Sequence, residues 1–234
     1  MAPRAGLGAD ATAPWAFELA THEHDGQACA LAVWRFAHPA LAVSSAPLGG
    51  GMGERSWIVN AQVPHSYDRH DPDAHLADMA ARRGLEGAGV GMLTAVDVRR
   101  LQHAEDDGAR AEVSVGVTLP TWAAAPDEPV AHERASGASH SASTGVGTIN
   151  VVAFVPERLE PAALVNAVMT VTEAKAQALW EAGLAATGTA SDAVCVACPA
   201  RGPAHLFGGP RSVWGARLAR AVHRAVRDGC EVAR

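Results

Sequence analysis

Short apolar runs alternate with longer amphipathic stretches along the chain. The short runs are rich in valine, alanine and aromatic residues and are bounded by Gly, Pro or Asp, which is typical of β-strands. The Asp25-Gly26 pair between the first two runs predicts a hairpin turn. We expect strands at residues 17–20, 28–36, 40–45, 57–63, 90–98, 112–119, 147–156 and 193–197.

Three longer stretches carry the start and stop signals of α-helices. Proline favours the first turn of a helix, and glycine favours the position just past its last turn. These signals predict helices at residues 72–83, 161–182 and 212–227, with Gly84, Gly183 and Gly229 just past their ends. Asp71 is expected to cap the first helix. The alternation predicts an α/β fold, a single layered domain with a mixed sheet and about three main helices.

Composition separates one domain from two less regular segments. Residues 1–14 predict a disordered leader, and residues 15–234 are expected to form the single domain. Residues 123–144, which are rich in Ala, Ser and His, predict a mobile loop within it. No apolar run has the length of a membrane span, and the first residues lack the apolar core of a signal peptide. These features predict a cytoplasmic protein.

Two segments of the chain contain similar motifs in the same order. In each segment a strand ending in Asn (WIVN or GTIN) is followed by Val-Pro, a helix, a glycine and a Thr-Ala-x-Asp motif. The two motifs lie at residues 94–97 and 189–192. Repetition in the same order suggests an internal pseudo-repeat of two strand–helix units.

Lys175 is the single lysine of the chain, and the other basic residues are arginines. In the predicted helix at 161–182 it falls on the apolar face, whereas Glu173 falls on the polar one. A lysine there must extend out to solvent, pair with a carboxylate or face a cleft. An ammonium group can lose its proton when it is desolvated, which a guanidinium group effectively cannot. Lys175 is therefore a candidate for acid–base chemistry.

The charge and the cysteines narrow the classes of function. A net charge of −6 gives no general attraction to nucleic acid or to an anionic membrane. Four cysteines in 234 residues do not amount to a disulfide scaffold. Cys195 and Cys198 have CxxC spacing, but strand alternation directs their sulfurs to opposite faces, so zinc or redox use is not expected. We expect no bound metal and no cofactor.

The glycine-rich loop LGGGMGERS follows a predicted strand that ends at Ser44 and Ser45. Its glycines allow a close approach of backbone to an anion or a flat ligand, or simply form a turn. Glu54 stands where a phosphate loop needs lysine, which argues against a nucleotide phosphate. A serine at a strand end can be a nucleophile with a lysine base, although two small residues before a proline are equally consistent with a simple loop.

Two further groups of residues have ordinary structural interpretations. His65, His70 and His75 recur every five residues and could ligate a metal, but scattered surface histidines are the simpler interpretation. The last predicted helix carries a row of arginines opposite an apolar face, as a solvated amphipathic helix does. An acidic partner is not required for it.

Taken together, several segments resemble the adenosylcobinamide amidohydrolases of corrinoid salvage. The matching segments are VSSAPLGGG, WIVN, GMLTAVDV, GTIN, TEAKAQAL, ATGTASDAV and FGGPRSVWG, in that order along the chain. The resemblance implies hydrolysis of the amide between the aminopropanol arm and the corrin ring. The products would be adenosylcobyric acid and 1-aminopropan-2-ol. The implied partner is a corrinoid substrate, and the only implied metal is the cobalt of that substrate.

The residue chemistry is compatible with this reaction. Amide hydrolysis needs an activated nucleophile, stabilisation of the oxyanion and a proton for the leaving amine. Lys175 with Asp192 is the candidate acid–base pair, and Ser45, Thr189 or a water molecule is the candidate nucleophile. The candidate substrate-binding residues are Ser44, Gly49, Gly50, Gly51, Asn60, Thr94, Asn150, Glu173 and Thr187. We expect Ser45, Asn60, Thr94, Asn150, Lys175 and Asp192 to border one cleft.

Two other classes of function stay open at the sequence level. A corrinoid carrier would need the pocket but no acid–base group. A general small-molecule amidase would need no cavity of corrin size. The sequence leaves the oligomeric state open.

Overall fold

The computed structural model describes residues 15–126 and 147–233, and these form one α/β structure around a single large mixed sheet. The predicted leader and most of the predicted loop at 123–144 lie outside the described residues. The larger strands are β1 (Trp15–His24), β2 (Gln27–Ser44), β3 (Gly51–Gln62), β4 (Gly89–Thr94), β5 (Gln102–Asp106), β6 (Ala109–Gly116), β7 (Thr148–Phe154) and β9 (Ala193–Pro199). The helices are α1 (Pro72–Arg82), α2 (Pro161–Glu181) and α3 (Val213–Ala233). The predicted fold class is therefore confirmed.

The sheet is continuous but folds over on itself. Its order is β4-β3-β2-β9-β7-β6-β5, with β1 paired to the first part of β2. The register of β2 against β3 shifts between Arg35 and Ala40, and only the last residues of β2 pair with β9. The break lets the β1–β4 half turn across the β5–β9 half, since irregularities of this kind bend a strand and increase its twist.

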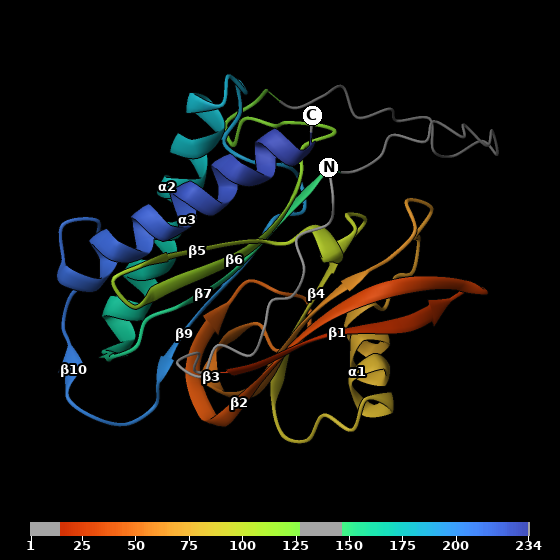
Figure 1. Ribbon diagram of the computed structural model, residues 1–234, viewed down its shortest axis with the longest axis horizontal. Helices are drawn as coiled ribbons and strands as arrows, with labels where there is room; N and C mark the ends of the chain where they lie inside the picture. The colour runs from red at the N-terminus through yellow and green to blue at the C-terminus, as the bar shows by residue number, and fades with distance from the viewer. Residues whose placement is uncertain (1–14, 127–146, 234) are drawn as a thin grey trace.

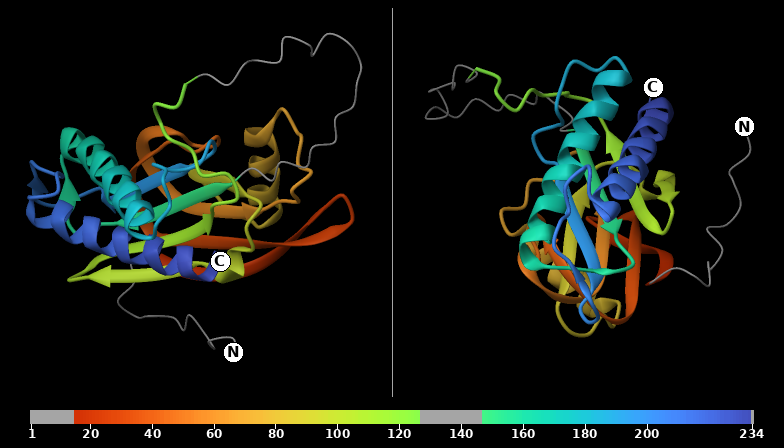
Figure 2. Two further views of the ribbon diagram at one scale, coloured as in Figure 1. Left: turned by 90° about the horizontal axis from the view of Figure 1, so that it is seen from above. Right: turned by 90° about the vertical axis from the view of Figure 1, so that its left-hand side faces the viewer.

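Three buried clusters define the layers of the molecule. Trp34 and Ile58 of one half of the sheet share a cluster with Val152 and Cys195 of the other half. A second cluster joins α2 and α3 to the outer face of β5, β6, β7 and β9. A third joins α1 to the outer face of β2 and β3. Figure 1 shows α2 and α3 side by side over one half and α1 beside the other, and Figure 2 shows the same layers from two further directions.

The two predicted strand–helix units share their connectivity. β3 runs parallel to β4 through α1, and β7 runs parallel to β9 through α2. The repeated motif does not fall at equivalent places, because residues 94–97 begin at the end of β4 whereas residues 189–192 precede β9.

Several boundaries differ from the sequence prediction. β3 begins at Gly51 rather than at residue 57, because residues 51–55 pair with the end of β2. β4 ends at Thr94, and β5 and the two-residue strands β8 (Arg158–Leu159) and β10 (Ala204–His205) were not predicted. The side chain of Asp71 makes no cap hydrogen bond with α1 and binds Arg69 instead.

The third helix does not end before Gly229. It continues to Ala233, and Gly229 is buried against β6. A Cβ atom at this position would lie 2.4 Å from Val115 Cγ2, so the glycine serves a close approach of helix to sheet rather than a helix end. The exposed arginines of α3 are held by carboxylates of the same chain, among them Asp106, Asp107 and Glu181. Among the described residues, no helix is long and apolar enough to cross a membrane.

Candidate active site

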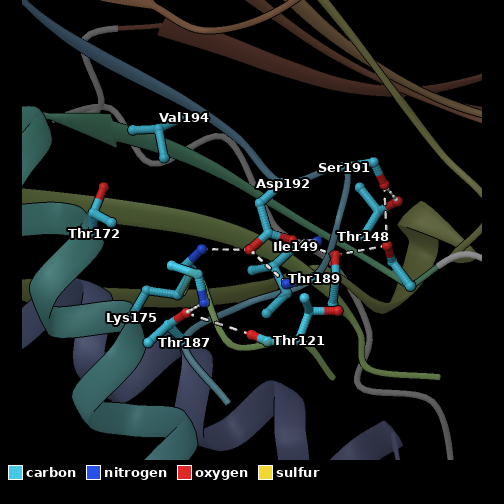
Figure 3. A network of polar contacts seen from close by, with 12 residues as sticks. Thr121, Thr148, Ile149, Thr172, Lys175, Thr187, Thr189, Ser191, Asp192 and Val194 are labelled. Atoms are coloured by element: carbon cyan, nitrogen blue, oxygen red, sulfur yellow. Dashed lines mark hydrogen bonds and ion pairs between the residues drawn. The ribbon is translucent and has the colours of Figure 1, made fainter. Parts of the chain in front are cut away.

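Lys175 lies in the middle of α2 on the face that packs against the sheet, and it is 6% exposed. Its ammonium group binds Oδ2 of Asp192, just before β9, and this carboxylate is also largely buried. Of the three situations expected for a lysine on an apolar face, the structure therefore has a buried ion pair. Figure 3 shows Lys175 reaching from the helix toward the loop that carries Asp192.

The Asp192 carboxylate is held by four donors. Oδ2 accepts from Lys175 and from the backbone N–H of Thr189 at 3.1 Å. Oδ1 accepts from the backbone N–H of Ile149 at 2.9 Å and from the hydroxyl of Thr189 at 2.5 Å. These contacts fix the carboxylate between a helix, a strand and its own loop.

The loop of residues 187–192 is shaped by a glycine that the ion pair requires. A Cβ atom at Gly188 would lie 2.3 Å from Asp192 Oδ2 and 2.6 Å from Lys175 Nζ. The next residue, Thr189, places its hydroxyl 2.6 Å from the carbonyl oxygen of Gly147 as well as against Asp192. One hydroxyl hydrogen thus faces two acceptors.

Two neighbouring segments secure this loop. The hydroxyl of Ser191 donates to the carbonyl of Gly147 at 3.0 Å and lies 2.7 Å from the hydroxyl of Thr148. On the other side, Thr121 and Gly188 form a short antiparallel bridge. The hydroxyl of Thr187 accepts from the backbone N–H of Ala123 at 2.8 Å. Thr187, a predicted substrate-binding residue, therefore has a structural partner.

Ser44 and Ser45 lie at the same end of the sheet as Asp192, because the last residues of β2 pair with the first residues of β9. The hydroxyl of Ser44 donates to the carbonyl of Val194 at 3.0 Å and is buried. The hydroxyl of Ser45 accepts from the backbone N–H of Val194 at 3.0 Å. Among the described residues neither serine contacts Lys175 or Asp192, whereas Thr189 contacts Asp192.

Asn60, Asn150 and Thr94 form a separate buried group. The side-chain amide of Asn150 donates to Asn60 Oδ1 at 2.9 Å and to the carbonyl of Leu93 at 2.9 Å. Asn60 in turn donates to the hydroxyl of Ser114 at 3.0 Å. Thr94 is 2% exposed and accepts from the backbone N–H of Val96. These side chains tie β3 and β4 to β6 and β7.

The sheet separates the two groups of polar residues. Ile149 and Val151 belong to the cluster under α2 and α3, whereas Val152 belongs to the cluster between the two halves of the sheet. Successive side chains of a strand point to opposite faces, so Asn150 points away from α2 and from Lys175. The single cleft expected from the sequence is thus divided between the two faces of β7. Strand alternation predicts this division, but the sequence does not indicate which face α2 covers.

The glycine loop and Glu173 also lie apart from the ion pair. Leu48 forms a bridge with Gly91 of β4, and Gly49, with φ of 68°, lies so close to Gly89 that a Cβ atom would be 1.9 Å from its carbonyl oxygen. Gly49 therefore serves the close packing of loop on strand. A Cβ atom at Gly50 would lie 2.7 Å from the carbonyl oxygen of Ala46 in the same loop, and Gly51, with φ of 81°, serves the turn into β3. Glu173 is exposed and lines a groove between α2 and α3.

The alternative metal and thiol sites find no support in the described residues. Cys195 and Cys198 face different buried clusters, as the alternation predicts, and burial raises the pKa of the Cys195 thiol to about 12. In the described part of the chain, no group of three His, Cys, Asp or Glu side chains is arranged to hold a metal ion. His75 is buried and lies 3.1 Å from the hydroxyl of Tyr67 through Nδ1.

Sequence reasoning missed four residues that support these groups. Ser114 joins the two asparagines, Thr148 and Ser191 brace the Asp192 loop, and Thr121 pairs with Gly188. Thr148 and Ser191 lie inside the GTIN and TASD segments, so the motifs themselves were a signal for these two residues. Ser114 and Thr121 depend on contacts between distant segments and leave no local signal.

The site combines a buried lysine–carboxylate pair with an adjacent hydroxyl at the strand ends of an α/β sheet. These groups can supply the acid, the base and the nucleophile of a hydrolytic enzyme. A family model described as adenosylcobinamide amidohydrolase matches residues 16–234. The chain therefore belongs to the adenosylcobinamide amidohydrolase family.

Two curated proteins of that name are similar to this chain. The adenosylcobinamide amidohydrolase of Methanosarcina mazei is 32% identical over 197 residues, which cover 80% of this chain and 89% of the relative. That of Halobacterium salinarum is 42% identical over 81 residues, or 35% of each chain. Among solved structures, a protein from Pyrococcus horikoshii OT3 matches with a TM-score of 0.40 and 9% identity over 88% of this chain and 77% of that chain, values too low to bear on fold or function.

Proposed function

We propose that this chain hydrolyses the amide that joins the aminopropanol arm of adenosylcobinamide to the corrin ring, with Lys175 and Asp192 as its acid–base pair. The single observation that carries the assignment of these residues is the buried contact between the ammonium and the carboxylate beside the Thr189 hydroxyl. Membership of the family and the names of the two curated relatives support the substrate.

The reaction adds one water molecule across the amide. A C–O bond forms at the carbonyl carbon, the C–N bond breaks, and the leaving nitrogen takes up a proton. In the proposal Asp192 accepts the proton of the nucleophile, and Lys175 donates a proton to the nitrogen of 1-aminopropan-2-ol. The second product is adenosylcobyric acid. The reaction as proposed uses no cofactor, and its cobalt enters and leaves with the substrate.

Thr189 is the side chain best placed to act as the nucleophile. Its hydroxyl lies 2.5 Å from Asp192 Oδ1, a distance at which a carboxylate can take its proton. Attack by Thr189 would form an ester that water then hydrolyses, whereas direct attack by water would leave no ester. The Ser45 hydroxyl accepts from the backbone N–H of Val194 and has no contact with Asp192 among the described residues, which makes it the weaker candidate of the two.

The enclosed pair lies beside an exposed loop, an arrangement that suits a slender substrate arm. Lys175 is 6% exposed, whereas Ala190 and Ser191 of the adjoining loop are exposed to solvent. The aminopropanol amide is thin enough to reach the pair while the wide corrin ring stays on the surface. All four cysteines are buried and none forms a disulfide bond, which is consistent with our proposal of a cytoplasmic enzyme.

The direct test is to incubate the purified chain with adenosylcobinamide and follow the products by mass spectrometry. We expect adenosylcobyric acid and 1-aminopropan-2-ol in equal amounts. Simple aliphatic amides serve as the comparison, and a general amidase would cleave them at similar rates. Binding of adenosylcobinamide without any release of aminopropanol would instead indicate a corrinoid carrier and would contradict the proposal.

A further inference from the structure

Two of the six tryptophans lie on the surface, and they lie together. Trp15, Trp34, Trp57 and Trp214 are 7% exposed or less, whereas Trp122 is 44% and Trp180 is 64% exposed. The rings of Trp122 and Trp180 have centroids 6.2 Å apart and planes inclined by 52°. Two large aromatic side chains side by side in solvent are unfavourable unless something covers them, so the pair indicates a contact surface.

The tryptophan pair is fixed to the proposed active site through short connections. Thr121, next to Trp122, donates its backbone N–H to the carbonyl of Gly188 at 2.8 Å and accepts from the backbone N–H of Thr187 at 3.0 Å. Gly188 in turn lies directly against Lys175 and Asp192. Figure 3 shows Thr121 and Thr187 beside Lys175. The backbone next to Trp122 is therefore joined by one β-bridge to the loop that carries Asp192.

The second tryptophan comes from the helix that carries the lysine. Trp180 lies five residues after Lys175, which is about 7.5 Å along the axis of α2 and about 140° around it, and its ring meets that of Trp122. Both rings are thus held by elements that also position the ion pair. A ligand whose amide reaches Lys175 and Asp192 would have its bulk within reach of these two rings.

We propose that Trp122 and Trp180 form an aromatic platform that binds a flat conjugated ring of the substrate while its amide lies at Lys175 and Asp192. The inference rests on the proposed function. Indole rings bind flat ring systems through stacking and apolar contact, without needing a specific hydrogen-bond pattern. Adenosylcobinamide carries two such systems, the corrin macrocycle and the adenine of its adenosyl group.

The test separates binding from chemistry in single variants. Trp180→Ala and Trp122→Ala should each raise KM for adenosylcobinamide about tenfold and leave kcat within about threefold, since an aromatic contact contributes about 1 kcal/mol or somewhat more. Equilibrium dialysis of the coloured corrinoid should show the same weakening of Kd. Met169→Ala is the matched control, because Met169 is 55% exposed on the same helix but lies eleven residues before Trp180, about 16 Å along the axis.

A second substrate distinguishes the two ring systems. Cobinamide with cyanide as its axial ligands keeps the corrin and lacks the adenine. If the variants weaken both corrinoids equally, the platform binds the corrin. If only adenosylcobinamide is affected, it binds the adenine. Circular dichroism checks folding, and Trp180→Leu replaces any alanine variant that fails to fold, since it keeps an apolar side chain without the ring.

Three results would contradict different parts of the account. Unchanged KM and Kd for both corrinoids in both variants would overturn the platform, even with a fully active wild-type enzyme. No turnover of adenosylcobinamide by the wild-type chain would overturn the proposed function first. A fall in kcat with unchanged Kd would also contradict the platform, because it would assign the tryptophans to the chemistry rather than to binding.

Discussion

At the scale of single residues, the proposed site depends on how closely one ion pair is enclosed. Lys175 was identifiable from the sequence as the only lysine and as a charged residue on an apolar helix face. Its partner was named from a motif, and the structure has the two in contact. The collision that a side chain at Gly188 would cause was not predictable, because it involves atoms from a helix and a loop that meet only in the folded chain.

Gly188→Ala should reduce turnover strongly while leaving the fold intact. The added Cβ atom would lie 2.3 Å from Asp192 Oδ2, so the carboxylate or the loop must move. A displacement of about 1 Å at a catalytic group can cost about 10²-fold in rate. The measurement is kcat with thermal unfolding monitored by circular dichroism. Ala190→Ser, at an exposed position in the same loop, is the control, and wild-type kcat in the alanine variant would show that the pair tolerates displacement.

At the scale of secondary-structure elements, the positions of strands and helices along the chain were predicted better than which elements pair or pack together. Capped helices and apolar strands have local signals, and α1 and α2 begin where proline indicates. The start of β3 and the end of α3 were missed because Gly51 and Gly229 usually interrupt regular structure. Here pairing with β2 and packing on β6 outweigh that local preference.

The contacts of the asparagine pair differ from those expected from the sequence. Asn60 and Asn150 were candidates for substrate contacts, but they bind each other and Ser114 and are each 1% exposed. The pair connects β3 to β7 across the inner cluster. Their role as substrate contacts remains a prediction. A structural role instead predicts that their substitution lowers the stability of the fold.

Asn60→Ala should lower the free energy of unfolding by about 1–3 kcal/mol, because it removes the acceptor of one Asn150 N–H and the donor to the buried Ser114 hydroxyl, while Asn150 keeps its bond to the carbonyl of Leu93. Urea unfolding measures the change. Gln177→Ala, at an exposed position on α2, should change stability by less than about 0.5 kcal/mol. Unchanged stability together with lost corrinoid binding would instead return Asn60 to the substrate-binding set.

At the scale of the whole molecule, one sheet supplies two different environments. Its bend places the asparagine group between the two halves, and α2 covers the ion pair on an outer face. The α/β class follows from the alternation of strands and helices. The gap between the predicted strands at 28–36 and 40–45 coincides with the register shift within β2, but it does not indicate that one continuous strand bends there. Lys175 and Asn150 lie on opposite faces because successive side chains of β7 alternate and α2 covers only one of its faces.

The central claim is that Lys175 and Asp192 transfer protons in amide hydrolysis by the intact enzyme. Arginine at position 175 keeps a positive charge that can pair with Asp192, but it cannot act as a proton donor or acceptor near neutral pH. Lys175→Met keeps the apolar stem and removes the charge. Circular dichroism confirms folding of both variants before any rate is compared.

The decisive measurement is kcat for adenosylcobinamide with Lys175→Arg, alongside equilibrium dialysis of the same corrinoid. The account predicts that kcat falls by about 10²–10⁴-fold, the usual contribution of one positioned acid–base group, while corrinoid binding stays close to that of the wild type. Lys175→Met should be equally poor in turnover. A Lys175→Arg enzyme that turns over at nearly the wild-type rate would contradict the account, because charge alone would then be sufficient at this position.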